Sequence, residues 1–265
     1  MKLFFRKEGS GPPLIVLHGL YGASDNWITI AKQLAKQNTV YLPDQRNHGR
    51  SPFANTHSYN NLKDDLHDFV NQQEIEKATL LGHSMGGKVA MWFAAHFPER
   101  TEKLIVADIA PKNYLLAPND SSFNLHRNIL LAMQEINFEE INSRNDVDSL
   151  LEEKIDDKRI RQFLLKNIVR DANTKRYKWR LNVPVLYNYL DEIVSGVDQN
   201  QLAPKAPVTN YPVTFIRGIN SNYILPEDET IIKNIYPESK IIDIQNSGHW
   251  LHAEQPVKFI EAVNS

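Results

Sequence analysis

Short apolar runs that alternate with helical patterns constrain the fold of this chain more than any other feature. The runs have the length of buried strands, and they lie at 14–17, 39–42, 79–81, 104–107, 213–216 and 240–244. Between them, apolar residues recur at helical spacing, for example across 27–35 and 89–97. This alternation predicts an α/β fold in which helices flank a mostly parallel sheet on both faces.

The middle of the chain has a different pattern. Residues 112–205 carry apolar residues mainly at helical spacing, together with many charged residues. We therefore expect an α/β core formed by residues 1–111 and 206–265, with residues 112–205 inserted as a helical cap, or lid.

Composition excludes several classes of site and partner. The 265 residues include no cysteine, so a disulfide framework, thiolate metal ligands and a cysteine nucleophile are all excluded. The net charge is −2 and the basic residues are scattered, so we expect no binding to nucleic acid or to an anionic membrane surface. No segment has the length of a membrane span, and residues 1–6 lack the apolar run of a signal peptide. We expect a cytoplasmic protein of ordinary enzyme size.

A serine between two glycines follows directly on the run at 79–81. Gly82-His83-Ser84-Met85-Gly86 has the pattern Gly-x-Ser-x-Gly, and a helical pattern begins immediately after it. A sharp turn from strand to helix would expose the Ser84 hydroxyl beside the amide donors of the helix N-terminus. Gly82 and Gly86 would leave room where strand and helix nearly touch. The segment predicts a nucleophilic serine, although five residues alone also fit a chance occurrence in a turn.

Nucleophilic serine catalysis also needs a general base. Ser247-Gly248-His249-Trp250 follows the last predicted strand, and the carboxyl ends of parallel strands share one edge of a sheet. We therefore expect His249 to be the base. His18 is expected to brace its own loop. The histidines expected only on the surface or in the core are His57, His67, His96 and His126.

The same edge of the sheet should supply the amides of an oxyanion hole. One is the amide of Met85, which follows the serine. We expect the other from Leu20, in the loop His18-Gly19-Leu20-Tyr21-Gly22 that follows the run at 14–17. This loop also fits the simpler interpretation of a glycine-rich turn that leads into the first helix.

Together, His18-Gly19, the Ser84 turn and His249 resemble the serine hydrolases of the α/β-hydrolase fold over essentially the whole chain. Asp44-Gln45-Arg46-Asn47-His48-Gly49-Arg50-Ser51 is similar to a more specific segment, Asp-x-Arg-Asn-His-Gly-x-Ser, of the YbfF-like bacterial esterases and their ABHD11-type relatives. The resemblance implies no metal and no organic cofactor. We expect Arg46 to reach backbone carbonyls and Gly49 to permit a turn, with direct substrate contact as the alternative.

The acid that orients His249 departs from the commonest pattern of this fold. Ser221 stands in the loop after the 213–216 run, where an aspartate is common, and a hydroxyl cannot balance the charge of an imidazolium. Asp108 is the better candidate, because it ends the strand next to the serine strand. The resemblance to YbfF-like esterases implies the same acid, with Ser221 in a supporting role. Two alternatives stay open, namely Asp108 as a cap or loop anchor and Asp228 as the acid.

These residues predict a carboxylesterase-type serine hydrolase that cleaves carboxylic esters, or acyl thioesters, through an acyl-serine intermediate. The expected partner is a small-molecule substrate, and the expected state is a monomer or a homodimer. The cap residues expected either to line an acyl pocket or to pack within the cap are Trp179, Leu186, Tyr187 and Leu190. A C–C bond hydrolase, a menaquinone-pathway-type lyase or a perhydrolase would use a similar pair of Ser84 and His249. A non-catalytic protein that keeps the fold as a ligand-binding cup is the other alternative.

Overall fold

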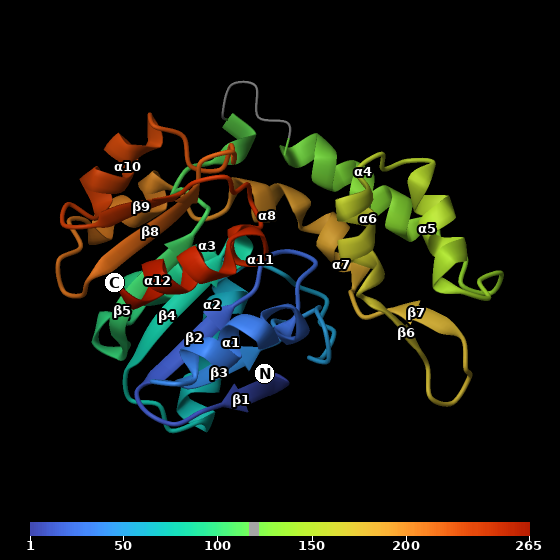
Figure 1. Ribbon diagram of the computed structural model, residues 1–265, viewed down its shortest axis with the longest axis horizontal. Coiled ribbons are helices and arrows are strands. Elements are labelled where there is room, and N and C mark those ends of the chain that lie inside the picture. The colour runs from blue at the N-terminus through green and yellow to red at the C-terminus, as the bar shows by residue number, and fades with distance from the viewer. Residues whose placement is uncertain (117–121) are drawn as a thin grey trace.

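The computed structural model describes residues 1–116 and 122–265. Within them, seven strands form one sheet in the order β1-β3-β2-β4-β5-β8-β9 (Figure 1). Neighbouring strands pair in parallel, except that β1 is antiparallel to β3. The strands are β1 (Phe5–Glu8), β2 (Pro13–Leu17), β3 (Thr39–Pro43), β4 (Ala78–His83), β5 (Thr101–Ala107), β8 (Val213–Gly218) and β9 (Lys240–Ile244).

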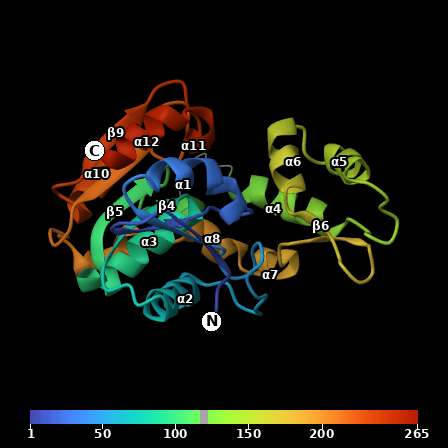
Figure 2. The same cartoon turned by 60° about the horizontal axis from the view of Figure 1, so that its bottom comes forward.

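Helices cover both faces of the sheet and enclose an apolar core on each (Figure 2). One layer consists of α2 (Tyr59–Gln72), α3 (Met85–His96) and α10 (Asp228–Ile235). The other consists of η1 (Ser24–Trp27), α1 (Ile28–Leu34), α11 (Leu251–Glu254) and α12 (Pro256–Asn264). The short helix η2 (Pro98–Arg100) connects α3 to β5. Leu80 and Leu81 of β4 point into opposite cores, which explains why the central strands are continuously apolar.

Between β5 and β8 the chain leaves the sheet. We call residues 112–116 and 122–205 the cap segment; residues 117–121, which fall inside the predicted cap range of 112–205, lie outside the described residues. In Figure 1 much of the cap segment extends to one side of the sheet. Its described elements are η3 (Tyr114–Leu116), α4 (Ser122–Gln134), α5 (Arg144–Glu152), α6 (Lys158–Leu165), β6 (Ile168–Arg170), β7 (Tyr177–Trp179), α7 (Val183–Asn188), α8 (Leu190–Ser195), α9 (Gln199–Leu202) and η4 (Ala203–Lys205).

The predicted fold class is confirmed, and the six predicted strand runs fall within β2, β3, β4, β5, β8 and β9. Two β elements escape the sequence patterns. β1 is an edge strand with the polar sequence Phe-Arg-Lys-Glu, so it lacks the apolar run of a buried strand. The antiparallel pair β6–β7 interrupts the helices of the cap segment, and its strands of three residues are too short to show a period.

None of the helices described within residues 1–116 and 122–265 combines the length and the apolar character that crossing a membrane requires.

Candidate active site

Ser84 lies in a strained turn between β4 and α3. Its φ of +53° and ψ of −122° place it in a region that L-residues rarely adopt, and its side chain is partly exposed. Strand and helix approach closely here, because a Cβ atom on Gly82 would lie 2.2 Å from the Gly86 carbonyl oxygen. A Cβ atom on Gly86 would lie 2.3 Å from the Leu17 carbonyl oxygen. The two glycines therefore allow the turn that presents the serine.

The register of the sheet brings Asp108 beside this turn. His83 of β4 pairs with Ala107 of β5, so the chain leaves both strands at neighbouring points, with Ser84 after one and Asp108 after the other. The Ser84 N–H donates to the Ala107 carbonyl at 3.0 Å. Asp108 also has a positive φ, of +53°, and its N–H donates to the Ile216 carbonyl of β8 at 2.9 Å.

Three donors converge on the fully buried carboxylate of Asp108. His249 Nδ1 donates to its Oδ2 at 2.8 Å, and the Ser221 hydroxyl donates to the same oxygen. The Gly218 N–H donates to Oδ1 at 3.1 Å. The structure thus brings together the two residues expected to act as base and acid, and it places Ser221 against the acid. Because Nδ1 carries the proton, Nε2 of His249 is the nitrogen able to accept one.

Two further side chains hold His249. The Tyr223 ring stacks on the imidazole, with centroids 3.9 Å apart and planes inclined by 21°. His83 Nε2 donates to the backbone carbonyl of His249 at 2.8 Å. Burial lowers the pKa of His83 well below its usual range, so His83 is a neutral donor at neutral pH. These contacts position the loop that carries His249, the predicted base.

Asp228, the alternative acid, has different partners. It opens α10 and is buried, and its Oδ2 lies 2.7 Å from Lys112 Nζ. The same oxygen accepts the Leu225 N–H at 2.8 Å. Its described hydrogen bonds therefore join the start of α10 to the cap segment, whereas the carboxylate against His249 is that of Asp108.

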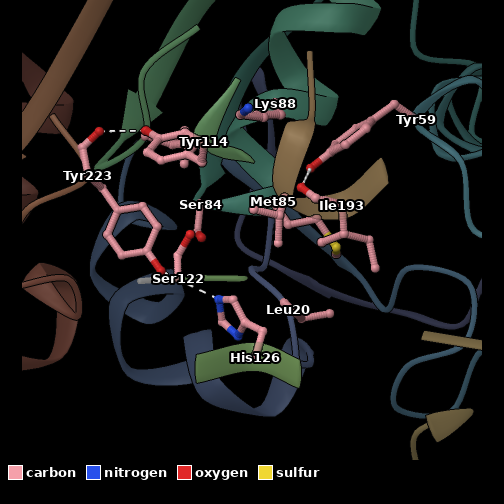
Figure 3. A pocket seen from close by; sticks show the side chains of 12 residues that line it. Leu20, Tyr59, Ser84, Met85, Lys88, Tyr114, Ser122, His126, Ile193 and Tyr223 are labelled. Atoms are coloured by element: carbon pink, nitrogen blue, oxygen red, sulfur yellow. Dashed lines mark hydrogen bonds between the residues drawn. The ribbon is translucent and has the colours of Figure 1, made fainter. Parts of the chain in front are cut away.

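Two cavities meet at Ser84. An inner cavity of about 30 Å³ lies beside Leu20 and Met85, whose amides are the predicted oxyanion donors (Figure 3). An outer cavity of about 570 Å³ also includes Ser84 and Leu20 and extends past His249 to Trp250 and Phe163. The inner cavity is further lined by Tyr59, Lys88, Ile109, Tyr114, Ser122, His126, Ile193, Val194 and Tyr223.

Trp179, Leu186, Tyr187 and Leu190 line neither cavity, so the first of their two expected roles, lining an acyl pocket, is wrong. The indole N–H of Trp179 donates to the Met133 carbonyl at 3.0 Å. Leu186 and Leu190 are buried in the apolar core, and Tyr187 packs against it. The other expected role, packing within the cap segment, is the one that these residues have. They stabilise the cap segment and do not face Ser84.

His126 and Tyr223 line the site although sequence patterns gave no reason to select them. His126, expected on the surface or in the core, projects from α4 and lines both cavities together with Ser84 (Figure 3). Its Nδ1 lies 3.3 Å from the Tyr21 hydroxyl. The only local signal for Tyr223 is its place two residues after Ser221. Both positions depend on how distant segments pack.

Residues 44–51, which we call the signature segment, contact the loop that follows β2. Arg46 pairs with the buried carboxylate of Asp65, with Nη2 and Oδ1 2.8 Å apart. It also contacts the Thr56 carbonyl at 3.5 Å, so the expected carbonyl contact is present but the main partner is a carboxylate. His18 accepts the Gln45 N–H at 3.0 Å, which agrees with a bracing role. His57 is buried, and burial lowers its pKa to about 3.

In the described ranges, no group of three or more His, Asp or Glu side chains has the arrangement of a metal site.

A family model described as alpha/beta hydrolase fold matches residues 12–256. The chain belongs to the α/β-hydrolase family. Within that family, Esterase YbfF of Escherichia coli (strain K12) is 31% identical to this chain over 258 residues, which cover 97% of this chain and 94% of the relative.

Two other relatives have related names. The sn-1-specific diacylglycerol lipase ABHD11 of Xenopus laevis is 35% identical over 259 residues, covering 96% of this chain and 78% of its own. A solved structure described as a marine microorganism esterase is 44% identical, with a TM-score of 0.92 and coverage of 99% of this chain and 98% of that one. The predicted resemblance to YbfF-like and ABHD11-type proteins is confirmed.

The same relatives bear on the predicted activity. They are named as esterases and as a lipase, which supports the prediction of an ester-cleaving α/β-hydrolase of the carboxylesterase type. They do not favour a C–C bond hydrolase, a lyase, a perhydrolase or a non-catalytic binding protein.

Proposed function

We propose that this α/β-hydrolase cleaves carboxylic esters with Ser84 as the nucleophile, His249 as the general base and Asp108 as the acid that orients the base. The observation that carries the proposal is the pair of Asp108 and His249, joined by a hydrogen bond of 2.8 Å at the edge where Ser84 leaves β4. The Asp108 carboxylate is fully buried, whereas the imidazole of His249 is partly exposed and lines the outer cavity.

Two half-reactions follow from this arrangement. Nε2 of His249 takes the hydroxyl proton as the Ser84 oxygen attacks the acyl carbon, and the amides of Leu20 and Met85 donate to the oxyanion. The bond to the leaving alcohol then breaks as His249 returns the proton to that oxygen. In the second half, His249 takes a proton from water, the water oxygen attacks the acyl-serine, and Ser84 regains its proton as the acid departs.

Asp108 and Ser221 support these proton transfers. The carboxylate keeps the proton of His249 on Nδ1 and stabilises the imidazolium that forms in each half-reaction. Ser221 and the Gly218 N–H occupy other acceptor positions of the carboxylate, so it is held in place without losing its charge.

The two cavities divide the substrate between them. His249 lines the outer cavity and must protonate the leaving group, so the alcohol occupies that cavity and the acyl group occupies the inner one. The inner volume of about 30 Å³ holds roughly two water molecules, which fits a short acyl group. The outer volume suits a bulky alcohol or thiol. The cap segment acts as a lid, because its residues Ser122, His126 and Ile193 close the acyl side.

Replacement of the nucleophile tests the proposal. Ser84→Ala should reduce kcat for p-nitrophenyl acetate by roughly 10⁴-fold or more, because no oxygen remains to attack the acyl carbon. A fluorophosphonate probe should label the unchanged protein and not the variant. Ser195→Ala, the same change at the end of α8, is the control and should retain activity and labelling. Full activity of Ser84→Ala would contradict the mechanism.

A further inference from the structure

The turn that carries Leu20 is held by groups that the proposed mechanism does not use. The Gly22 N–H donates to the Gly19 carbonyl at 3.0 Å, so Leu20 and Tyr21 occupy the central positions of a β-turn, which we call the oxyanion turn. Tyr21 is buried and has a φ of +62°, in the left-handed region that a bulky residue disfavours. Such a conformation persists only where surrounding contacts hold it.

His48 of the signature segment holds the amide side of Tyr21. Nδ1 of His48 donates to the Arg46 carbonyl at 2.9 Å, so Nε2 carries the lone pair that accepts the Tyr21 N–H at 3.3 Å. His48 is completely buried, and burial holds its pKa well below the usual range. The ring therefore stays neutral and keeps this lone pair. The peptide group between Leu20 and Tyr21 is fixed as a result.

Asn167 of the cap segment holds the carbonyl side of Tyr21. Its side chain is buried, and Nδ2 donates to the Tyr21 carbonyl at 2.8 Å. The backbone of Asn167 is itself tied into the cap segment, because its carbonyl accepts the Arg180 N–H at 2.7 Å and its N–H donates to the Leu164 carbonyl at 2.9 Å. The Tyr21 hydroxyl also lies 3.3 Å from Nδ1 of His126, another residue of the cap segment.

We propose that His48 and Asn167 are positioning residues for the oxyanion hole. They fix the two peptide groups on either side of Tyr21, and thereby hold the preceding residue, Leu20, so that its amide meets the oxyanion. Neither residue is among those that line the inner or the outer cavity in the described part of the chain. Because Asn167 belongs to the cap segment, the oxyanion turn has its full set of supporting hydrogen bonds only when the cap segment packs against the loop after β2. This inference rests on the proposed function.

Two substitutions remove the supporting hydrogen bonds one at a time. Asn167→Asp keeps the shape of the side chain but replaces the donor to Tyr21 with a carboxylate oxygen. Its control is Asn173→Asp, the same change at an exposed position of the cap segment. His48→Phe removes the acceptor, and His48→Gln, which keeps an acceptor near Nε2, should recover much of the loss. Asn167→Ala serves as a second variant where Asn167→Asp folds poorly.

The readout must separate positioning from folding. Active sites are counted from the acylation burst with p-nitrophenyl acetate, so kcat refers only to folded protein. We expect kcat to fall by about 10- to 100-fold in Asn167→Asp and His48→Phe with little change in KM, since a misplaced oxyanion donor weakens the transition state alone. Affinity for a trifluoromethyl ketone, which forms a tetrahedral oxyanion on the serine, should fall in proportion. Affinity for the corresponding methyl ketone should not change.

Three results would overturn the inference: an unchanged kcat per active site, a loss confined to KM, or unaltered affinity for the trifluoromethyl ketone. Each differs from a failure of the proposed function itself. If the unchanged protein neither hydrolysed esters nor reacted with the fluorophosphonate, the function would be wrong. If it did both and the variants matched it, only the positioning roles of His48 and Asn167 would be wrong.

Discussion

At the scale of single residues, Asp108 combines complete burial with a formal charge. Three donors surround its carboxylate, from His249, Ser221 and Gly218, and without them the burial of a charged group would be strongly unfavourable. The same donors fix the direction in which the carboxylate faces the imidazole. Asp228 is also buried, but its charge is balanced by Lys112. Asp108 and Asp228 are thus both buried but have different partners, so the same substitution at each position can be compared directly.

Asparagine at each position should separate the two roles. Asp108→Asn should reduce kcat by about 10⁴-fold, because a neutral amide neither stabilises the imidazolium nor enforces the required tautomer. Asp228→Asn should leave kcat close to that of the unchanged protein, while the free energy of unfolding falls by about 3 kcal/mol as Lys112 loses its partner. Steady-state kinetics and urea unfolding measure the two effects. The opposite pattern would make Asp228 the acid.

At the scale of elements, the packing of α3 against the sheet depends on glycine. Gly86→Ala would place a methyl group 2.3 Å from the Leu17 carbonyl oxygen, so α3 must move away from the end of β2. We expect a loss of about 1–3 kcal/mol in the free energy of unfolding, together with slower labelling of Ser84 by a fluorophosphonate. Gly248→Ala is the control for stability, because its nearest neighbour would lie 3.5 Å away. Equal stability of the two variants would contradict the close approach.

In the proposed function, residues of the cap segment help to enclose the acyl group. Across p-nitrophenyl acetate, butyrate and octanoate, we expect kcat/KM to fall roughly tenfold at each step, because the inner cavity has no room for a longer chain. Ile193→Ala should enlarge this cavity and move the preference toward butyrate. Leu150→Ala, on an exposed part of the cap segment, should leave the order unchanged. Fastest cleavage of octanoate by the unchanged protein would refute this assignment. Thioesters of the same acids extend the comparison to thiol leaving groups.

At the scale of the whole molecule, buried neutral histidines make stability depend on pH. Burial lowers the pKa of both His57 and His252 to about 3, and His252 stacks on Trp27 with centroids 4.2 Å apart. The positive charge of Arg46 also disfavours protonation of His57. Lys166 has the same effect on His252. Below about pH 6.5 the unfolded chain binds protons at these positions and the folded chain does not.

Stability should therefore be full above about pH 6.5 and decrease as the pH falls toward 3. Each buried histidine contributes roughly 1.4 kcal/mol per pH unit in this window. Urea unfolding at pH 7.5, 6 and 5 measures the slope. His252→Phe keeps the stacked ring but removes the titrating group, so the slope should become smaller. His67→Phe, at a half-buried position, is the control. An unchanged slope in His252→Phe would contradict the expectation.

Some residues of the site could be predicted because the sequence immediately around them carries a recognisable pattern. The serine turn could be predicted because an apolar strand, two glycines and a helical pattern stand within about twenty adjacent residues, and each reflects backbone geometry at its own position. His249 could be selected by its place after the last strand. Asp108 could be favoured over Ser221 as the acid, because a hydroxyl carries no charge, while Asp228 stayed open as an alternative. The candidates Ser84, His249 and Asp108 depended on the order of strands along the chain, and the supporting role of Ser221 came from the resemblance to YbfF-like esterases.

Other contacts have no local signal. Asp108 and His249 are 141 residues apart, and Tyr21 and Asn167 are 146 apart. Nothing near Asn167 or His126 in the sequence indicates that either contacts the loop after β2. The mistaken acyl-pocket assignment of Trp179 has the same origin, since the local sequence of an aromatic residue looks alike whether the ring faces a cavity or packs against a neighbouring element.

The alternating α/β core, the strained serine turn and the candidate base can all be derived from the amino-acid sequence. Those features follow from side-chain periodicity and from the steric freedom of glycine, which act over a few residues. The carboxylate that meets His249, the small size of the inner cavity and the residues that support the oxyanion turn became visible once the chain was folded. Those features arise where the cap segment packs against the edge of the sheet, and such packing joins residues that no local pattern relates.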